Sequence, residues 1–245
     1  MDPRTTWPAL LALVLLAGCS KDGMEPPLSG SERLIGVRFD PHCDGLPYHP
    51  DSLYSDWTGT RLRFDDLRLV LVGACLRGDQ GLVLLDRPDD ILTFDLAAED
   101  PPVQYLDPGL SAMDDVHWLD TRTLSLADST GPAAGHGWTG CGAVTCQAVL
   151  DLRGVIDGNG DGVLDGSDTP FRVLVRAGEE PTALRIHAHA IAPVERELTI
   201  AVNITALVNG LDLVDQPMNV VESPQTALVL QNLRTIVLGA DNKPL

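Results

Sequence analysis

Residues 62–71 read LRFDDLRLVL, and this stretch decides the fold class of the chain. Apolar residues alternate with charged ones at its start and become continuous at its end, which predicts a β-strand with at least one buried face. Eight other short runs share this character, at 34–39, 82–85, 91–96, 123–126, 148–155, 171–175, 183–191 and 198–204. Turn residues (Gly, Pro, Asn and Asp) separate the runs. We therefore predict an all-β fold, an antiparallel β-sandwich of about nine strands.

The C-terminal region is the one part with mixed periodicity. Residues 226–238 fit either a strand or a short helix, and residues 205–211 predict a single helical turn. No repeat at a fixed period and no long amphipathic helix is evident in the sequence. One domain, residues 33–245, is therefore expected instead of an α/β arrangement.

Charge and composition exclude two broad classes of protein. The 245 residues include 35 acidic and 17 basic ones, a formal net charge of −18. Nucleic-acid binding needs a clustered cationic surface, which this chain lacks. A hydrophobic content of 44% is ordinary for a folded protein and too high for a wholly disordered one.

The N-terminus predicts a lipid anchor. The apolar run at 9–16 is followed by Leu16-Ala17-Gly18-Cys19. It is shorter than the roughly 20 residues of a membrane span but suits a secretory signal. The LAGC ending resembles the bacterial lipobox, which implies a signal peptide at 1–18, acylation of Cys19 and a flexible tether over 19–32. An ordinary signal peptide, with Cys19 incidental, is the alternative.

These features predict a location in the cell envelope. Ser20 after the acylated cysteine favours the outer membrane by the usual sorting rule, with the domain facing the periplasm or the outside. The predicted partners are therefore the membrane, which the lipid anchor binds, and metal ions. The sequence does not identify a protein partner.

Four cysteines remain beyond the anchor, in a compartment that permits disulfides. Four cysteines allow three connectivities, and the sequence cannot choose between them rigorously. The short spacing of Cys141 and Cys146 favours a local clip, which leaves Cys43 with Cys75. No CxxC pair or haem-attachment motif is present, so redox or thiolate chemistry has no specific support.

Residues 157–168, DGNGDGVLDGSD, carry the sharpest motif. Oxygen ligands stand at the positions of an EF-hand calcium loop, namely Asp157, Asn159, Asp161, the Val163 carbonyl, Asp165 and Asp168, with Gly162 at the sharp turn. The flanking residues predict strands, and Asp168 replaces the usual Glu. We therefore expect structural calcium and not a helix-pair switch. The alternative is a Gly/Asp-rich turn that binds nothing.

Two histidines, His187 and His189, share one face of a predicted strand. Leu184, Ile186, Ala188 and Ala190 occupy the opposite face, toward the core. The pair could share one transition metal with a third ligand from elsewhere, the candidates being His42, His49, His117, His136 and Met113. An exposed polar strand face is the equally simple alternative.

The order of elements resembles the methanobactin-associated periplasmic copper-binding (MbnP-like) family. The likeness extends over residues 61–69, 82–86, 135–138, 148–154, the strand with His187 and His189, 198–211 and 227–233. It implies an all-β exported domain that binds copper through His and a Met/Trp-containing segment. The family's Met-x-Trp-x-Trp stretch is replaced here by 135–141, GHGWTGC, so only Trp138 carries over, beside His136. His187 or His189 matches the family's strand histidine.

The leading functional prediction is a non-catalytic, lipid-anchored metal-binding domain with structural calcium and possible copper. A calcium-stabilised envelope adhesion or interaction module without a transition metal is the first alternative. An exported enzyme is the second. No G-x-S-x-G or H-E-x-x-H motif supports it, and Asp114, Asp115 and His117 are its strongest candidates in a turn-like stretch.

Overall fold

A computed structural model describes residues 35–78, 81–96, 104–106, 116–141, 144–187, 197–220, 224–234 and 237–238. They belong to one unit, Leu34–Leu245. Its strands are β1 (Ile35–Cys43), β2 (Leu46–Pro47), β3 (Tyr54–Ser55), β4 (Arg61–Arg77), β5 (Val83–Asp95), β6 (Gln104–Leu106), β7 (Trp118–Thr123), β8 (Trp138–Cys141), β9 (Val144–Ile156), β10 (Thr169–Arg176), β11 (Ala183–His187), β12 (Glu197–Asn203), β13 (Met218–Val220) and β14 (Val237–Leu238). The helical segments are η3 (Leu126–Thr130), η4 (Pro132–Gly135), α1 (Ile204–Leu207) and α2 (Pro224–Leu233).

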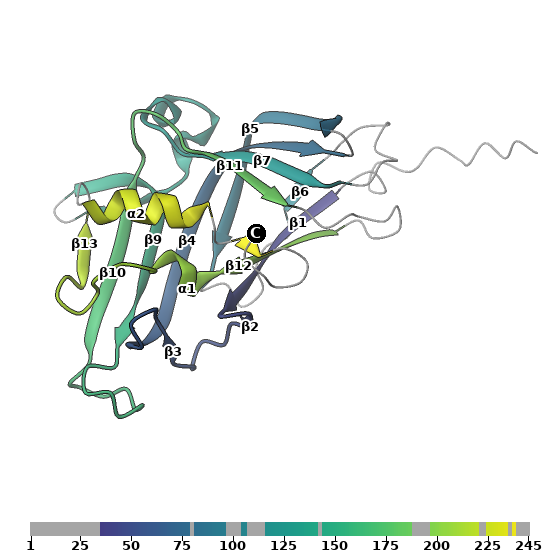
Figure 1. Cartoon of the computed structure of the whole chain (residues 1–245). Coiled ribbons are helices and arrows are strands. Elements are labelled where there is room, and N and C mark those ends of the chain that lie inside the picture. Colours follow the sequence, from purple (N-terminus) through teal and green to yellow (C-terminus); the bar gives the residue numbers. More distant parts are fainter. Residues whose placement is uncertain are drawn as a thin grey trace, which may run out of the picture. The chain divides into compact units, whose positions relative to one another are not determined.

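The strands form two sheets, which confirms the predicted all-β fold (Figure 1). The larger sheet has the order β11-β7-β4-β9-β10-β13, with β3 and β5 paired to β4 and β8 paired to β9. The smaller sheet has the order β14-β12-β1-β2, with β6 paired to β1. Most pairs are antiparallel, but β1 pairs with β12 and β10 with β13 in parallel.

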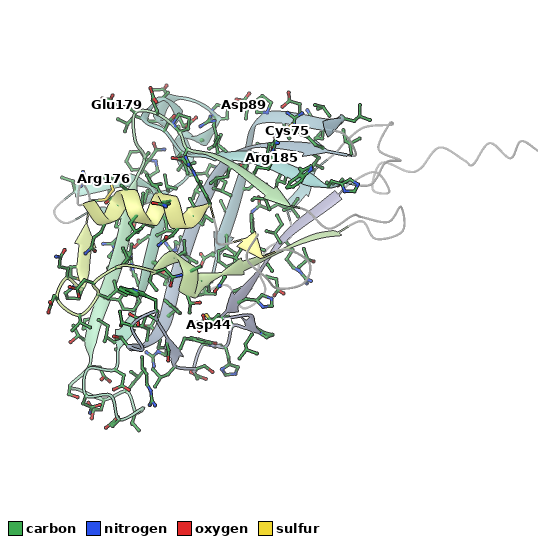
Figure 2. All side chains as sticks on the ribbon, in the orientation of Figure 1. Asp44, Cys75, Asp89, Arg176, Glu179 and Arg185 are labelled. Carbon is green, nitrogen blue, oxygen red and sulfur yellow. A yellow bond between two sulfur atoms is a disulfide. The ribbon has the colours of Figure 1, made fainter. Side chains whose placement is uncertain are left out.

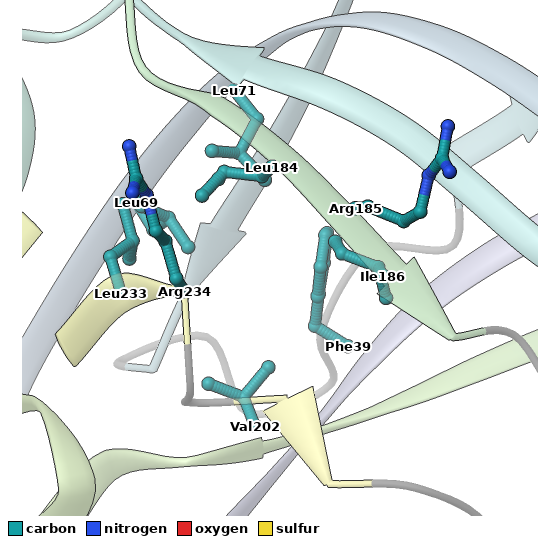
Figure 3. A pocket seen from close by; sticks show the side chains of 9 residues that line it. All are labelled: Phe39, Leu69, Leu71, Leu184, Arg185, Ile186, Val202, Leu233 and Arg234. Carbon is teal, nitrogen blue, oxygen red and sulfur yellow. The ribbon is translucent and has the colours of Figure 1, made fainter. Parts of the chain in front are cut away.

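The hydrophobic core lies between the inner faces of these sheets. Phe39 and Val202 of the smaller sheet face Leu69, Leu71 and other apolar side chains of the larger sheet around a small cavity (Figure 3). The Phe39 and Phe94 rings meet edge to face, with centroids 5.7 Å apart. Strand alternation therefore buries one face of β4, as the pattern at 62–71 predicts.

Strand β5 differs from the prediction because two expected runs are continuous in it. The turn residues at 87–90 suggested a break between 82–85 and 91–96, yet β5 extends from Val83 to Asp95. In the described residues β5 pairs with β4 alone, so Pro88 removes no hydrogen bond on a second side. The pairing register shifts at this point, because Gly73 (φ +80°) on β4 lies opposite residues 88–90, which bulge out of β5.

Other strand predictions need smaller corrections. The run 123–126 is not a strand, because β7 ends at Thr123 and η3 begins at Leu126. Strands β2, β3, β6, β8, β13 and β14 are too short to leave a periodic signal. In the mixed C-terminal stretch, helix α2 precedes the two-residue strand β14.

The two α-helices pack together near β10. The predicted helical turn at 205–211 is found as α1, at 204–207. Helix α2 buries Val229 and Leu233, and the Asn232 Nδ2 group donates to the carbonyls of Leu207 (3.1 Å) and Asn209 (2.7 Å). No helix within the described residues has the length and apolarity needed to cross a membrane.

Candidate functional site

The acidic loop between β9 and β10 is organised around its first residue. Asp157 is buried, with 5% of its surface exposed, and its two carboxylate oxygens accept from the Gly160 and Gly162 amides at 2.8 Å each. Gly160 and Gly162 both adopt positive φ angles (+72° and +83°), which favour glycine. The Gly-rich sequence is therefore required for the backbone to wrap around the Asp157 carboxylate.

The remaining acidic residues turn back onto the same loop. Asp168 accepts from the Gly158 amide (3.2 Å) and from the Asp165 amide, so the last position of the motif lies beside the first. Asp161 accepts from the Val163 amide (2.7 Å) and Asp165 from the Ser167 amide (2.7 Å). The Asp161 carboxylate also accepts from Asn159 Nδ2 (3.0 Å). Each carboxylate oxygen has two lone pairs, so one remains on an oxygen that accepts a single bond, whereas Asp165 Oδ1 accepts from both the amide and the hydroxyl of Ser167.

The loop carries concentrated negative charge without a matching salt bridge. None of its four aspartates forms an ion pair with a Lys, Arg or His among the residues that the structure describes. Arg61 is the cation beside the loop: its guanidinium lies over Gly162, 2.3 Å from where a Cβ would stand. The Arg61 carbonyl also accepts from the Asp157 amide at 3.0 Å, which joins β4 to the loop.

The acidic side chains are not gathered around a single point. Within the described ranges, no three His, Cys, Asp or Glu side chains form a group able to hold a metal ion. The reason in the loop is local, because its carboxylates bond to nearby amides in succession along the backbone. To bind Ca²⁺, the carboxylate oxygens would have to turn toward one common point, while their bonds to the backbone amides keep the loop in its present shape.

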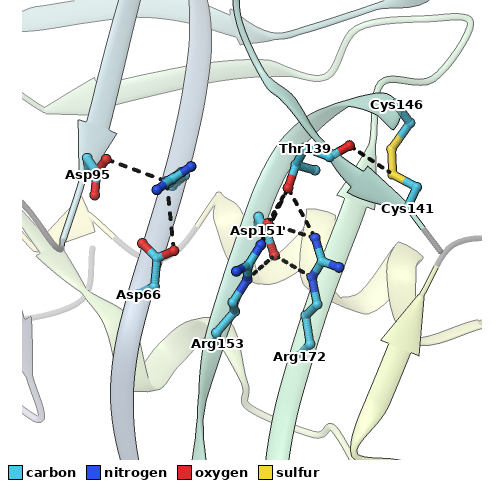
Figure 4. A network of polar contacts seen from close by, with 9 residues as sticks. Asp66, Asp95, Thr139, Cys141, Cys146, Asp151, Arg153 and Arg172 are labelled. Atoms are coloured by element: carbon cyan, nitrogen blue, oxygen red, sulfur yellow. Dashed lines mark hydrogen bonds and ion pairs between the residues drawn. A yellow bond between two sulfur atoms is a disulfide. The ribbon is translucent and has the colours of Figure 1, made fainter. Parts of the chain in front are cut away.

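The local disulfide prediction is confirmed. Cys141 and Cys146 form a bond that closes the β8–β9 hairpin, with Cα atoms 5.8 Å apart. The disulfide lies at the end of the hairpin, and Thr139 on the same strand reaches the buried Asp151 (Figure 4).

The second predicted disulfide is wrong, because Cys43 and Cys75 are both free thiols. Cys43 ends β1 near Tyr48, whose hydroxyl donates to the Phe64 carbonyl at 2.7 Å. Cys75 lies eleven residues beyond Phe64 on β4, which corresponds to about 35 Å. A disulfide needs Cα atoms within about 7 Å. Asp44 and Cys75 accordingly lie at opposite ends of the domain in Figure 2.

Two of the four predicted copper residues line one cleft. His136 caps η4, and Trp138 begins β8. Both border a cleft of about 450 Å³ that is also lined by Arg68, Asp95 and Asp151. Trp138 is 50% exposed, and its indole N–H donates to the Ala134 carbonyl at 2.6 Å.

The backbone of His187, a third predicted copper residue, lies away from this cleft. The backbone of His187 pairs with Trp118 on β7, and Trp118 pairs with Arg77 at the far end of β4. The cleft is bordered instead by Arg68, Leu69 and Val70, roughly 25 Å back along the same strand. The strand alternation is as predicted, with Leu184 and Ile186 buried. The side chain of His187 and all of His189 lie outside the described residues.

A buried charge network next to this cleft was missed by the sequence analysis. Asp151 has 3% of its side chain exposed and bonds to Arg153, Arg172 and Thr139. Burial alone would raise the pKa of Asp151, but the hydrogen bonds from the two arginines and Thr139 outweigh it and lower the pKa to about 2. The sequence feature that could have indicated this network is the two-residue spacing of Asp151 and Arg153 within the predicted strand, which places both side chains on one face.

Several predictions lie outside the described residues. They are the signal peptide at 1–18, the acylated Cys19, the tether at 19–32, and the enzyme candidates Asp114 and Asp115.

Comparisons with known proteins give little beyond this geometry. No protein-family model and no curated protein matches the chain. Among solved structures the chain is similar to MbnP from Methylosinus trichosporium, with 13% identity, a TM-score of 0.41, and coverage of 71% of this chain and 76% of that one. Neither family membership nor a ligand follows from a likeness of this size.

Proposed function

We propose that this protein is a non-catalytic, lipid-anchored metal-binding domain of the cell envelope, in which the 157–168 loop binds calcium for structural purposes. The observation that carries the proposal is the loop itself. Four aspartates and one asparagine stand at the sequence positions of the EF-hand calcium pattern, and none of the four carboxylates has a salt-bridge partner among the described residues. A cation would relieve the repulsion between them.

The position of the loop supports a structural role. It joins β9 to β10, and the Asp157 amide bonds to β4 through the Arg61 carbonyl (3.0 Å). A bound ion would therefore tie together the ends of three neighbouring strands of the larger sheet. The strands on both sides leave no helix pair to open, so a regulatory switch is not part of the proposal.

The anchor and the absence of catalysis are proposed on sequence grounds. The apolar run and Cys19 support export and acylation. The acidic surface and the tether also suit an envelope adhesion or interaction module without a transition metal. Copper at His187, His189, His136 and Trp138 stays a prediction, because the described residues provide only the His136–Trp138 part of that set in one place.

Thermal unfolding of Asp157→Asn tests the calcium proposal. We expect calcium at about 1 mM to raise the Tm of the unsubstituted protein above its Tm in EDTA, because an ion that binds only the folded state stabilises that state. The Asp157→Asn variant should lose this calcium-dependent increase. The matched control is Asp89→Asn, the same charge change at an exposed strand position away from the loop (Figure 2). If calcium raises the Tm of all three proteins equally, or of none, the proposal is refuted.

A further inference from the structure

The cleft beside β8 has the size of a small-molecule site. Its volume of about 450 Å³ is typical of pockets that hold sugars, nucleosides or drug-sized ligands. Strands β4, β5 and β9 form its floor, while η4 and the start of β8 form its rim. It belongs to the outer side of the larger sheet, since the alternate residues Leu67, Leu69, Leu150 and Leu152 are the ones buried in the core.

The rim presents a fixed aromatic face. The indole N–H of Trp138 is engaged by the Ala134 carbonyl, so the ring edge is held while half of the residue stays exposed. Gly137 before it has φ +71°, and a Cβ there would stand 2.7 Å from the Ala148 carbonyl oxygen and from Leu124 Cδ1. The close approach of Gly137 to β9 therefore constrains the backbone that carries Trp138, and the bond to Ala134 holds the ring. An aromatic face of this kind binds C–H-rich ring faces through its negative quadrupole.

In the floor, the Arg68 guanidinium is only loosely engaged. The Arg68 guanidinium lies 3.5 Å from the Asp95 carboxylate and 3.7 Å from the Asp66 carboxylate, both longer than good hydrogen bonds. About half of the Arg68 side chain is exposed (54%). The exposed His136 ring has no hydrogen-bond partner among the described residues. A ligand hydroxyl could accept from Arg68 and bridge to its carboxylate neighbours.

The charges around the cleft cancel. The charged residues that line it are Arg68, Asp95 and Asp151. Arg68 pairs with Asp66 and Asp95, and Asp151 pairs with Arg153 and Arg172, so these two groups together hold three arginines and three aspartates (Figure 4). This local balance contrasts with the net charge of −18 of the whole chain. A phosphate or a quaternary amine would have to enter without an unpaired counter-charge, which is unfavourable. An uncharged, polyhydroxylated ligand meets no such penalty.

We propose that this cleft binds a neutral saccharide, with one pyranose face stacked on Trp138 and the ring hydroxyls bonded to Arg68, Asp95 and His136. The stacking face and the balanced polar floor together match the two sides of a sugar ring, which is apolar on its C–H faces and polar at its edge. The proposal is independent of calcium in the 157–168 loop.

Calorimetric titration of the full chain with maltotriose, cellotriose and chitotriose tests it. At least one of these should bind saturably, and Trp138→Ala should weaken that binding by about tenfold or more. Arg68→Gln should weaken it as well, because it removes the charged donor. The matched control is Trp57→Ala, which removes another exposed tryptophan (62%) that does not line the cleft and should leave binding unchanged.

Charged probes complete the test. Glucose 6-phosphate and choline should bind more weakly than the best neutral sugar. The proposal is overturned if no trisaccharide binds, if the affinity is unchanged in Trp138→Ala, or if either charged probe binds more tightly at Trp138. Melting curves of the variants show whether each remains folded. We expect Trp138→Ala to remain folded, because the exposed Trp138 ring contributes little to the core.

Discussion

Arg172 on β10 holds Asp151 on β9 with two parallel hydrogen bonds, from Nε to Oδ1 at 2.7 Å and from Nη2 to Oδ2 at 2.8 Å. Arg153 adds a third strong bond, from Nη2 at 2.8 Å. This is the two-point geometry in which an arginine and a carboxylate interact most strongly. The carboxylate is buried, so its charge is stabilised by these partners and not by water.

Acid should therefore weaken the protein through Asp151. Its pKa is about 2 in the folded state, against about 3.9 for an ordinary aspartate. A lowered pKa contributes stability that is full above about pH 4 and is lost as the pH falls toward about 2, roughly 2 kcal/mol in all. In Asp151→Asn this part of the pH dependence should disappear from denaturant-unfolding curves measured between these two pH values.

The same substitution should also be costly at neutral pH. Asp151→Asn leaves Arg153 and Arg172 together without a counter-charge, so we expect a loss of about 3 kcal/mol. The control is Asp65→Asn, which breaks an exposed ion pair with Arg63 (2.7 Å) and should cost less than about 1 kcal/mol. Equal losses in the two variants would show that the network around Asp151 is not a buried structural unit.

Gly154 should be intolerant of any side chain. It pairs with Phe64 on β4 and with Phe171 on β10, and the two rings meet edge to face with centroids 6.1 Å apart. A Cβ on Gly154 would stand 2.1 Å from the Arg63 carbonyl oxygen and 2.6 Å from the Phe171 ring.

Gly154→Ala should accordingly reduce the free energy of unfolding by about 3 kcal/mol. Gly140→Ala is the control, because no atom lies within 4 Å of its Cβ position, and it should change the free energy by less than about 0.5 kcal/mol. Urea unfolding of both variants measures the difference. A mild effect at Gly154 would contradict the close contact of β4, β9 and β10 at this point.

Alkylation followed by mass spectrometry should separate the cysteines into three classes. Cys75 is partly exposed and should react first in the native protein. Cys43 is 1% exposed, and burial followed by the charge of Asp44 raises the pKa of its thiol, so it should react only after unfolding. Cys141 and Cys146 should react only after reduction. A bond between Cys43 and Cys75 would contradict the arrangement of β1 and β4.

The sequence predicts the large sheet well because the long strands β4, β9 and β10 carry enough residues for alternation to show. It fails where tertiary contacts override local signals. Pro88 suggests a turn but lies in a continuous strand, because β5 uses only one side for pairing. Cys43 was paired with Cys75 only because Cys141 and Cys146 had been assigned to each other. That assignment does not consider how far apart β4 places the two remaining cysteines.

The candidate sites show the same limit. The acidic loop is contiguous, so its residues and their spacing could be read from the sequence directly. The cleft combines β4, β5, η4, β8 and β9, and no pattern within one segment indicates that Arg68 and Asp95 border the same cavity as Trp138. His136 and Trp138 were singled out only as metal ligands, whereas their surroundings are those of a polar cleft.

Metal content is the most direct test of the central claim. The chain, equilibrated with calcium and copper and then dialysed, should retain about one calcium per molecule by elemental analysis, and Asp157→Asn should retain none. Copper that persists and is lost in a His187→Ala/His189→Ala double variant would establish the additional copper site. A protein that retains no calcium under these conditions, or that retains it equally in Asp157→Asn, would contradict the proposed role of the 157–168 loop.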